Sequence, residues 1–509
     1  MRGPHNIWRL IRTGATFERT GAMQAILDAF EAPRLIRVVV RAVVWPFRWL
    51  GHRGDPAMPP VTRALTVLGP AYIKFGQILS TRPDVVGDEL AEQLRVLQDR
   101  LPPFPVAAAK AEVERELGVP ADQLFATFSE PVAAASIAQV HKATLADTGE
   151  EVAVKVLRPG IERAFRRDLD AFHFAANAIG VLLPGSRRLK PVDVVAHFEG
   201  VVIGELDLRL EAASASEFQA NTRDDDGFTL PQVRWDLSSR RVMTLGWAEG
   251  IGLGDVAAID AAGHDRRDLA LRVMQLFLNH ALRDGYFHGD MHHGNLKVAA
   301  NGDIIAYDFG IMGHIDEYTR RVYAGILFGF IRRDYKRVAE LHFEAGYVPA
   351  DRDVDEFARA LRAVGEPIFG MDASRISMGR LLAYLFEVTE RFGMETRTEL
   401  ILLQRTMVVV EGVARTLDPR MNIWDAAKPV VEKYIRSSIG PRALTRDLVQ
   451  TARVLARFGP RLPGLAEAVL VRQMQGDPPP PRRPIRAIAG WIALGAGAMA
   501  ALVLLAELL

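Results

Sequence analysis

Two strings in the middle of the chain carry residue types that can hold metal ions on nucleotide phosphates. HGDMHHGN spans residues 288–295, and YDFG follows at residues 307–310. An aspartate that acts as base or orienter, an asparagine five places later and the aspartate of a DFG tripeptide together serve phosphoryl transfer with two Mg²⁺ ions. Asp290, Asn295 and Asp308 fit that order and spacing. Because Mg²⁺ prefers carboxylate and carbonyl oxygens, these residues predict binding of ATP or ADP with Mg²⁺.

A lysine pattern upstream supplies a second part of the same chemistry. The string EEVAVKVL contains the V-A-x-K pattern of protein kinases, whose lysine contacts the α and β phosphates. Lys155 is that lysine, and Val140 stands fifteen residues before it, at the kinase spacing from the valine that closes the glycine-rich loop. A DFG tripeptide alone is more often an ordinary turn, whereas the whole order is specific. The combination predicts a kinase-like nucleotide site.

The candidate phosphate loop has alanines where kinases have three glycines. Its sequence is AAASIAQV, residues 133–140. Glycine accepts φ > 0 and lets backbone N–H groups approach phosphate, and alanine does both less readily. We therefore expect the nucleotide to lie differently from its pose in an ordinary protein kinase. Besides Lys155, the predicted nucleotide-binding residues are Ala133, Ala134, Ala135, Ser136, Ala138 and Val140.

Two departures from the protein-kinase pattern concern regulation and substrate. Gly289 stands where an arginine usually precedes the catalytic aspartate, so control by activation-loop phosphorylation is not expected. After Gly310 the sequence passes quickly into a helical pattern, and no A-P-E string follows. The usual platform for a peptide substrate is therefore not expected either.

Two further sequence motifs indicate which kinase-like family the chain resembles. AYIKFGQILSTRPDVV carries K-x-G-Q at residues 74–77, and GELDLRLEAASASEF carries E-x-D at residues 205–207 with a glutamate downstream. With the alanine-rich loop and the HGDxHxGN and DFG strings, the chain resembles the UbiB/AarF family of atypical kinases, which support ubiquinone biosynthesis. The resemblance covers roughly residues 65–330.

The resemblance implies a role for each matching residue of the nucleotide site. Lys155 would contact the phosphates and pair with Glu211, the glutamate of helix C. Asp290 would be the catalytic-loop aspartate, and Asn295 and Asp308 would be the metal ligands. The resemblance also implies an atypical kinase of the phosphotransferase type, acting as an ATPase or a small-molecule kinase more than as a protein kinase.

The two family-specific strings are implied to form a lid. The lid would pack over the active site where a peptide would otherwise enter. Its residues would be Lys74, Gly76 and Gln77 of K-x-G-Q with Glu205 and Asp207 of E-x-D. On one continuous helix, Asp207 and Glu211 stand at i and i+4 and share a face, whereas Glu205 points away from both. Asp207 and Glu211 could line one cleft or form a solvated acidic helix face, and the spacing leaves both readings open.

Composition bounds the fold and the partners. At 509 residues with 49% hydrophobic content, the chain can form a two-lobed core with extensions. Cysteine is absent, so nothing requires an oxidising compartment, and the catalytic domain is expected in the cytoplasm. A net charge of +1 argues against nucleic acid as a partner bound by bulk electrostatics.

Two segments could contact a lipid bilayer. Residues 487–506 run without a charge and can span a membrane, after a stiff Pro/Arg linker at residues 476–486. Arginines before the span keep the catalytic domain in the cytoplasm, which predicts a single-pass C-terminal anchor in the inner membrane. Gly490, Ala493, Gly497 and Ala501 have the small-xxx-small spacing that could support a homodimer. Residues 34–50 mix arginines with apolar residues and could lie in a bilayer interface or pack as a partly buried helix on the kinase fold. Pro46 shortens any regular amphipathic helix there.

The expected fold is α+β, with a two-lobed protein-kinase-like core, a helical N-terminal extension and a C-terminal transmembrane helix. A hairpin is predicted around residues 147–149, and helices are expected to dominate from about residue 265. The expected units are a basic amphipathic region (1–60), the K-x-G-Q helical extension (61–125), a kinase-like N-lobe with the alanine-rich loop and E-x-D insertion (126–250), a helical kinase-like C-lobe (251–475), the linker (476–486) and the transmembrane helix (487–506).

Two functions are compatible with these features. The first is a membrane-anchored Mg-ATPase or kinase that acts on, or gives access to, a polyprenylphenol precursor of ubiquinone, beside the other biosynthetic enzymes. The second is a scaffold that holds those enzymes together and binds nucleotide without catalytic turnover of it. A complete set of Lys155, Asp290, Asn295 and Asp308 favours turnover, because a scaffold would not need every catalytic group.

Overall fold

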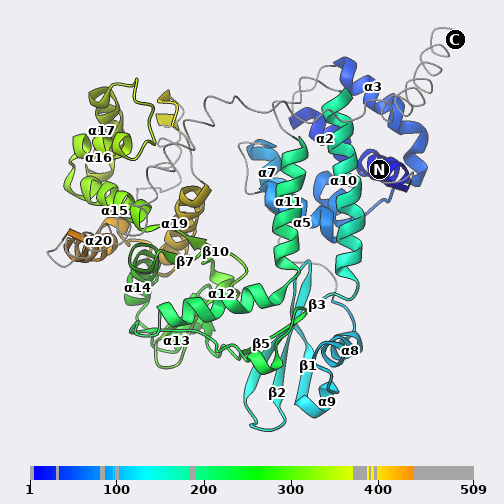
Figure 1. The fold of residues 1–509 in the computed structure, drawn as a ribbon, viewed down its shortest axis with the longest axis horizontal. Coiled ribbons are helices and arrows are strands. Elements are labelled where there is room, and N and C mark those ends of the chain that lie inside the picture. Colours follow the sequence, from blue (N-terminus) through cyan, green and yellow to red (C-terminus); the bar gives the residue numbers. More distant parts are fainter. Residues whose placement is uncertain are drawn as a thin grey trace, which may run out of the picture. The chain divides into compact units, whose positions relative to one another are not determined.

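The chain folds into helices and short sheets. The computed structural model (Figure 1) describes residues 5–29, 34–80, 86–95, 97, 103–182, 191–370, 387–388, 391–394 and 398–439. By its internal contacts the chain divides into two compact units, Met1–Ile435 and Arg436–Leu509. The first unit contains every residue of the predicted site.

An antiparallel sheet with the strand order β1-β2-β3-β5 carries the predicted phosphate-binding segments. Its strands are β1 (Phe125–Ala134), β2 (Ala138–Leu145), β3 (Glu151–Leu157) and β5 (Val242–Gly246). β2 and β3 form the predicted hairpin. Because neighbours in a strand point to opposite faces, the buried Val154 and Val156 leave Lys155 on the other face of the sheet.

The valine face of this sheet is closed by helix α8 (Val106–Leu117), which is followed by α9 (Ala121–Leu124). Ala109 and Val113 of α8 are fully buried in one cluster with the valines of β3. That face is therefore filled by core side chains, and chemistry at the sheet is restricted to the face that bears Lys155.

Three helices separate β3 from β5. α10 (Ile161–Leu182) and α11 (Pro191–Glu205) pack on each other, and α12 (Leu208–Asn221) packs on β5. The side chain of Asp207 accepts a hydrogen bond from the backbone N–H of Arg209 and caps the start of α12. α11 and α12 are thus two helices with a break at residues 206–207.

Helices also make up most of the described N-terminal extension. They are α1 (His5–Thr20), α2 (Ala22–Ala29), α3 (Arg34–Val44), the 3₁₀ helix η1 (Trp45–Leu50), α4 (Pro60–Leu68), α5 (Pro70–Ser80) and α7 (Asp88–Arg95). The rings of Tyr72 and Phe75 on α5 pack against Phe172 of α10, with centroids 4.9 Å and 5.6 Å apart. These aromatic contacts attach the extension to the helices inserted after β3.

Two small sheets follow, and four of their strands lie beyond residue 265, where helices were expected to dominate. A two-stranded antiparallel sheet pairs β10 with β7, and a mixed sheet has the order β4-β9-β8-β6 with β4 and β9 parallel. These strands are β4 (Phe228–Thr229), β6 (Ile251–Gly252), β7 (Tyr286–His288), β8 (Leu296–Val298), β9 (Ile304–Ala306) and β10 (Met312–His314). The catalytic-loop string lies between β7 and β8, and the DFG string follows β9, so the two sheets bring both strings together.

The remaining elements are helical. They are η3 (Trp235–Leu237), α13 (Val256–Ala261), α14 (Arg266–Asn279), the π-helical turn η4 (His280–Asp284), η5 (His293–Asn295), α15 (Glu317–Arg332), α16 (Tyr335–Glu344), α17 (Val354–Gly370), α19 (Thr398–Leu417) and α20 (Ile423–Ile439). α14 packs on α19, and α15 packs on α16.

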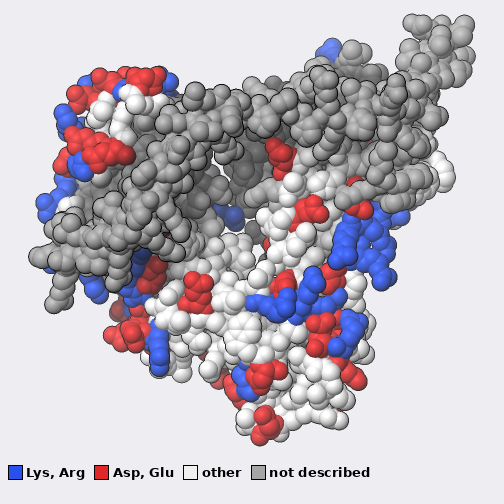
Figure 2. Space-filling view, in the orientation of Figure 1, with Lys and Arg blue, Asp and Glu red and all other residues white. Residues whose placement is uncertain are grey.

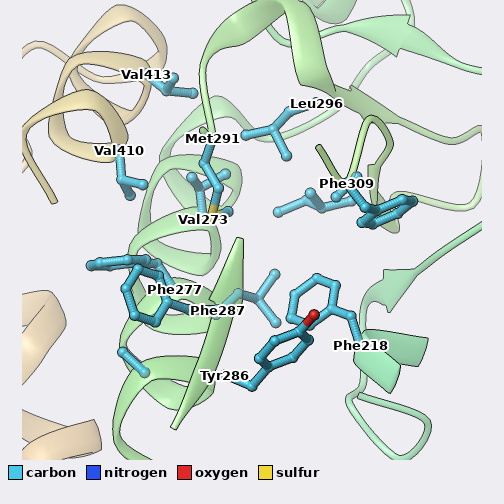
Figure 3. Close-up of a cluster of buried hydrophobic side chains, with 14 of the residues drawn as sticks. Phe218, Val273, Phe277, Tyr286, Phe287, Met291, Leu296, Phe309, Val410 and Val413 are labelled. Carbon is cyan, nitrogen blue, oxygen red and sulfur yellow. The ribbon is translucent and has the colours of Figure 1, made fainter. Parts of the chain in front are cut away.

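The largest hydrophobic core lies directly behind the two motif strings. Figure 3 shows Met291 of the catalytic loop and Phe309 of the DFG string among side chains from α12, α14, β7 and α19. Met291 and Phe309 are each 1% exposed. Because core packing is as dense as that of an organic crystal, these two buried anchors restrict the positions of Asp290 and Asp308 beside them.

The predicted transmembrane helix at residues 487–506 and the linker at residues 476–486 lie outside the described residues. Among the helices that are described, none is both long and apolar enough to cross a bilayer.

Candidate active site

Lys155 forms an ion pair with Glu211, as the resemblance implied. Its Nζ lies 2.6 Å from Oε1 of Glu211, and the two side chains are 17% and 10% exposed. Burial raises the pKa of Glu211. Burial lowers the pKa of Lys155, but the carboxylates of Asp308 and Glu211 more than offset this and raise it above its ordinary value. Since Lys155 belongs to β3 and Glu211 to the first turn of α12, the pair joins this helix to the sheet.

The carboxylate of Asp308 lies close to the same ion pair. Its Oδ1 lies 3.6 Å from Nζ of Lys155, and its side chain is 51% exposed. The φ angle of Asp308 is 67°, in the left-handed region, and the backbone N–H of Gly310 donates to Oδ1 at 3.3 Å. Such conformations persist where the surroundings impose them, often at functional sites. The Lys155 ammonium lowers the pKa of Asp308, so the carboxylate stays ionised and available to a cation.

The catalytic loop is held by its own hydrogen bonds. The backbone N–H of Asp290 donates to Nδ1 of His288 at 3.0 Å, and His288 is fully buried. Nδ2 of Asn295 donates to the backbone oxygen of Asp290 at 2.9 Å. The N–H of Tyr307 donates to the backbone oxygen of Asn295 at 3.1 Å, which brings Asn295 next to Asp308. Asp290, Asn295 and Asp308 therefore lie together in the fold, as their spacing predicted.

Gly289 is required by packing. A Cβ atom at this position would come within 2.9 Å of Cγ2 and 3.1 Å of the backbone oxygen of Ile311. The N–H of Gly289 donates to that oxygen at 2.8 Å, and its own oxygen accepts from the hydroxyl of Thr406 on α19 at 2.9 Å. The space that an arginine would fill in a protein kinase is thus taken by the chain itself.

The alanine-rich loop is an ordinary strand-to-strand turn. Ala133 pairs with Val140 across β1 and β2, and the N–H of Ala135 donates to the oxygen of Ala138 at 2.8 Å. Among the described residues only Asp308 and Arg333 are non-glycine residues with positive φ, so none of the alanines needs glycine's conformational freedom.

The same strands place the loop beside the lysine. Val140 of β2 is the register partner of Lys155 of β3, which gives the fifteen-residue spacing a physical basis in the hairpin. Ser136 is buried, at 7% exposure, whereas Ala134 and Ala135 are partly exposed. The six nucleotide-binding residues predicted besides Lys155 lie in this turn or on the strands that flank it.

Contacts to the alanine loop include residues that the sequence did not suggest. Nη2 of Arg158 donates to the backbone oxygen of Ala135 at 3.2 Å, and its guanidinium lies 5.6 Å from the ring centroid of Phe104. The N–H of Phe104 donates to Oε1 of Gln139 at 3.0 Å. The segment before α8 therefore holds the loop from outside the sheet. No motif marks these residues, so spacing alone could not identify them.

An ion pair joins the K-x-G-Q segment to the E-x-D segment, the two parts of the predicted lid. Nζ of Lys74 on α5 lies 2.6 Å from Oε1 of Glu205 at the end of α11, with exposures of 19% and 21%. The Glu205 carboxylate is one of the charges that raise the pKa values of Lys155 and Glu211. Ion pairs and this electrostatic effect relate five side chains, which we call the charged cluster: Lys74, Glu205, Lys155, Glu211 and Asp308.

Gly76 and Gln77 do not reach the charged cluster, because they pack inside the extension. A Cβ on Gly76 would come within 2.4 Å of Cδ1 of Leu97 and 2.7 Å of Cδ1 of Leu65. Nε2 of Gln77 donates to the backbone oxygen of Leu97 at 2.9 Å. These two residues hold α5 against its neighbours and thereby position Lys74.

The expectation for the E-x-D string was wrong. It assumed one continuous helix, in which Asp207 would share a face with Glu211 and Glu205 would point away. The helix breaks at residues 206–207, and Asp207 turns to Arg209, with Oδ2 2.6 Å from Nη2. The side-chain hydrogen bond from Arg209 lowers the pKa of Asp207. Glu205, and not Asp207, is the carboxylate that joins Glu211 near Lys155.

The residues at the site fit a magnesium ion bound with a nucleotide. Because Nδ2 of Asn295 is used by the backbone of Asp290, the amide oxygen is the atom left to serve as a ligand. With the ionised carboxylate of Asp308, this provides two hard oxygen ligands, and phosphate and water oxygens would complete the shell. Within the described ranges there is no group of three or more His, Cys, Asp or Glu side chains suited to a metal.

Two family models match the chain. The model described as the ABC1 atypical kinase-like domain matches residues 96–342, and the model described as the UbiB helical domain matches residues 361–422. The first range contains the whole charged cluster except Lys74. The mixed helix and strand content and the site geometry agree with a kinase-like fold.

Individual proteins give the same result over longer stretches. Proteins named "Probable protein kinase UbiB" are 41% identical in Marinobacter nauticus over 420 residues (82% of this chain, 77% of the relative) and 40% identical in Azotobacter vinelandii over 447 residues (86% and 83%). The solved structure of Rv3197 from Mycobacterium tuberculosis, in complex with erythromycin, is 27% identical with a TM-score of 0.52 and covers 72% of this chain and 93% of that chain. The chain therefore belongs to the UbiB family of ABC1 atypical kinase-like proteins, as the motifs predicted.

Proposed function

We propose that this protein is a membrane-anchored ATPase or small-molecule kinase that binds Mg-ATP and supports ubiquinone biosynthesis. One observation carries the proposal. Lys155 lies 2.6 Å from Glu211 and 3.6 Å from Asp308, which is the arrangement that an active kinase site needs, and the half-exposed carboxylate of Asp308 is left for a metal.

Each residue then has a task in phosphoryl transfer. Lys155 binds the α and β phosphates and is held in place by Glu211. Asp290, on its hydrogen-bonded loop, orients the attacking water or hydroxyl and accepts its proton as the new bond to the γ-phosphorus forms and the bond to the ADP oxygen breaks. Asp308 and the Asn295 amide oxygen would hold Mg²⁺, which neutralises charge on the phosphates when it is bound.

The lid favours a small or lipid substrate over a peptide. α5 is attached to α10 by aromatic packing and reaches the charged cluster through Lys74 and Glu205. In this arrangement the K-x-G-Q helix takes part in the site itself. A polyprenylphenol precursor of ubiquinone, presented from the bilayer to which residues 487–506 would anchor the chain, is the substrate class that we propose.

The scaffold remains the competing function, and one measurement separates the two. Mg²⁺-dependent ATP turnover by the full chain is measured with and without liposomes that contain a polyprenylphenol. Asp308→Asn is the test variant, and Asp303→Asn, which makes the same chemical change in the turn between β8 and β9, is the matched control. We expect Asp308→Asn to lose at least about a hundredfold in turnover, because it removes the metal ligand, and Asp303→Asn to keep it.

The outcome for the unmodified chain decides between the functions. Turnover that rises with the lipid supports the ATPase or kinase. Tight nucleotide binding without turnover in any condition would overturn the proposal and leave the scaffold.

A further inference from the structure

We infer that the 3₁₀ helix η1 is a second membrane contact, which docks on an anionic lipid surface. The observation is a group of exposed aromatic side chains that includes no residue of the candidate active site. Trp45, Phe47 and Trp49 of η1 are 64%, 41% and 74% exposed, and we call these three side chains the η1 surface. None of the six side chains of η1 is buried.

The two helices that contact η1 also expose large apolar side chains. Val38 of α3 is 65% exposed and Trp8 of α1 is 51% exposed, and both helices contact η1. Soluble proteins rarely leave several large apolar side chains exposed together, and such patches mark interaction sites. Of the two readings open for residues 34–50, partial burial does not apply to the η1 rings.

The backbone of η1 is firmly held while its rings face outward. Nη1 of Arg19 on α1 donates to the backbone oxygens of Gly51 at 2.7 Å and Trp49 at 3.3 Å. The N–H of His52 donates to the hydroxyl of Thr16 at 3.1 Å. A Cβ on Gly51 would fall within 2.4 Å of the Ala15 backbone, so the chain here lies directly against α1. The aromatic side chains are therefore displayed by a fixed support.

Charge identifies the partner as an anionic bilayer. Between Glu31 and Asp55 the chain has five arginines and no acidic residue. Arg37 pairs with Asp28 and Arg41 with Glu18, and the side chain of Arg41 remains 68% exposed. Tryptophan rings beside arginines are the composition of segments that lie at the lipid headgroup level, where ring edges meet the acyl boundary and cations meet anionic headgroups.

Further basic side chains occur on the helix to which α1 is attached. Figure 2 shows Lys and Arg side chains gathered beside α10, where Arg163, Arg166 and Arg167 are exposed. Arg9 of α1 pairs with Asp168 of α10 at 2.5 Å.

A protein partner with an acidic, apolar face or a second copy of the chain could also cover aromatic rings. The excess of arginine in this segment makes self-association less favourable than contact with an anionic lipid surface.

The absence of cysteine from the chain permits a direct test in the full-length protein. Trp49→Cys is labelled with an environment-sensitive NBD fluorophore. Trp235→Cys, an exposed tryptophan of η3, is the matched control. Both proteins are titrated with phosphatidylcholine vesicles with or without phosphatidylglycerol. Trp45→Cys repeats the measurement from a second position in case Trp49→Cys folds poorly.

We expect the label at position 49 to shift to the blue and brighten several-fold with phosphatidylglycerol vesicles, and to be quenched by a nitroxide-labelled lipid. The label at position 235 should stay aqueous, even if residues 487–506 anchor the chain. Arg48→Glu in the labelled protein should weaken the dependence on phosphatidylglycerol. A label at position 49 that stays aqueous on vesicles overturns the inference. A blue shift that grows with protein concentration without lipid also overturns it, in favour of a second copy. Neither result depends on ATP turnover.

Discussion

Nζ of Lys74 and Oε1 of Glu205 lie 2.6 Å apart and join the N-terminal extension to the charged cluster around Lys155. The two residues come from different helices and from the two family-specific strings. This ion pair places a negative charge next to the position that we propose for ATP phosphates. It also distinguishes Glu205 from Asp207, the other acidic residue of its string.

Removing the charge of Glu205 should strengthen nucleotide binding. Glu205→Gln takes one negative charge away from a site that must accept anionic phosphates, and we expect a several-fold lower Kd for an ATP analogue, or about 1 kcal/mol. Isothermal titration calorimetry measures it. Asp207→Asn is the matched control, because its carboxylate pairs with Arg209 on the exposed side, and its Kd should not change. Equal effects from the two variants would contradict the assignment.

Gly289→Ala should damage the catalytic loop. The added Cβ would meet Cγ2 of Ile311 at 2.9 Å, so either the catalytic loop or Ile311 must shift. We expect a loss of about 1–3 kcal/mol in unfolding free energy together with reduced turnover. Urea denaturation measures the loss. Gly412→Ala in α19 has open space around its Cβ and should be neutral or stabilising by up to about 1 kcal/mol.

Phe218→Ala should show how α12 is coupled to the DFG string. The ring of Phe218 lies 6.2 Å from that of Phe309 and is fully buried, two helical turns beyond Glu211 (Figure 3). Removing the ring would leave a cavity next to both Phe309 and Tyr286, so we expect a loss of about 3–5 kcal/mol in unfolding free energy. Thermal unfolding followed by circular dichroism checks it. Trp235→Ala at an exposed site should cost far less.

The folded protein should lose stability as the pH falls below about 6.5. Burial lowers the pKa values of His280, His288 and His342. The unfolded chain then takes up protons that the folded chain does not, so the unfolding free energy is highest above pH 6.5 and decreases toward the lower folded pKa values. Urea denaturation at about pH 7.5 and pH 5.5 measures this difference.

His342→Gln isolates one contribution away from the site. His342 lies on α16, and its Nδ1 donates to the oxygen of Val338 at 2.7 Å. The variant should show a smaller loss of unfolding free energy on acidification than the unmodified protein, whereas the exposed His314→Gln should keep the full loss. An unchanged pH dependence in His342→Gln would contradict the role of this residue.

The sequence by itself predicted which of the candidate nucleotide-site residues lie close together in the fold. Asp290 and Asn295 lie on one short loop. Val140 lies opposite Lys155 because the spacing of two residues in a hairpin fixes which residues pair across its strands. Local geometry of this kind depends on few residues, so the motif order was sufficient to predict the family, the hairpin and the kinase-like fold. The pairing of Lys155 with Glu211 followed from the resemblance.

Only the tertiary structure decided which carboxylate of the E-x-D string joins the site. The prediction from helical spacing required residues 205–211 to form one unbroken helix. Asp207 is instead the N-cap of α12, so the spacing rule does not apply across it. The pairing of Lys74 with Glu205, the packing that excludes a side chain at Gly289 and the exposure of the η1 rings all depend on segments distant in sequence. Their positions follow from the summed packing of several helices and strands, which no local pattern contains.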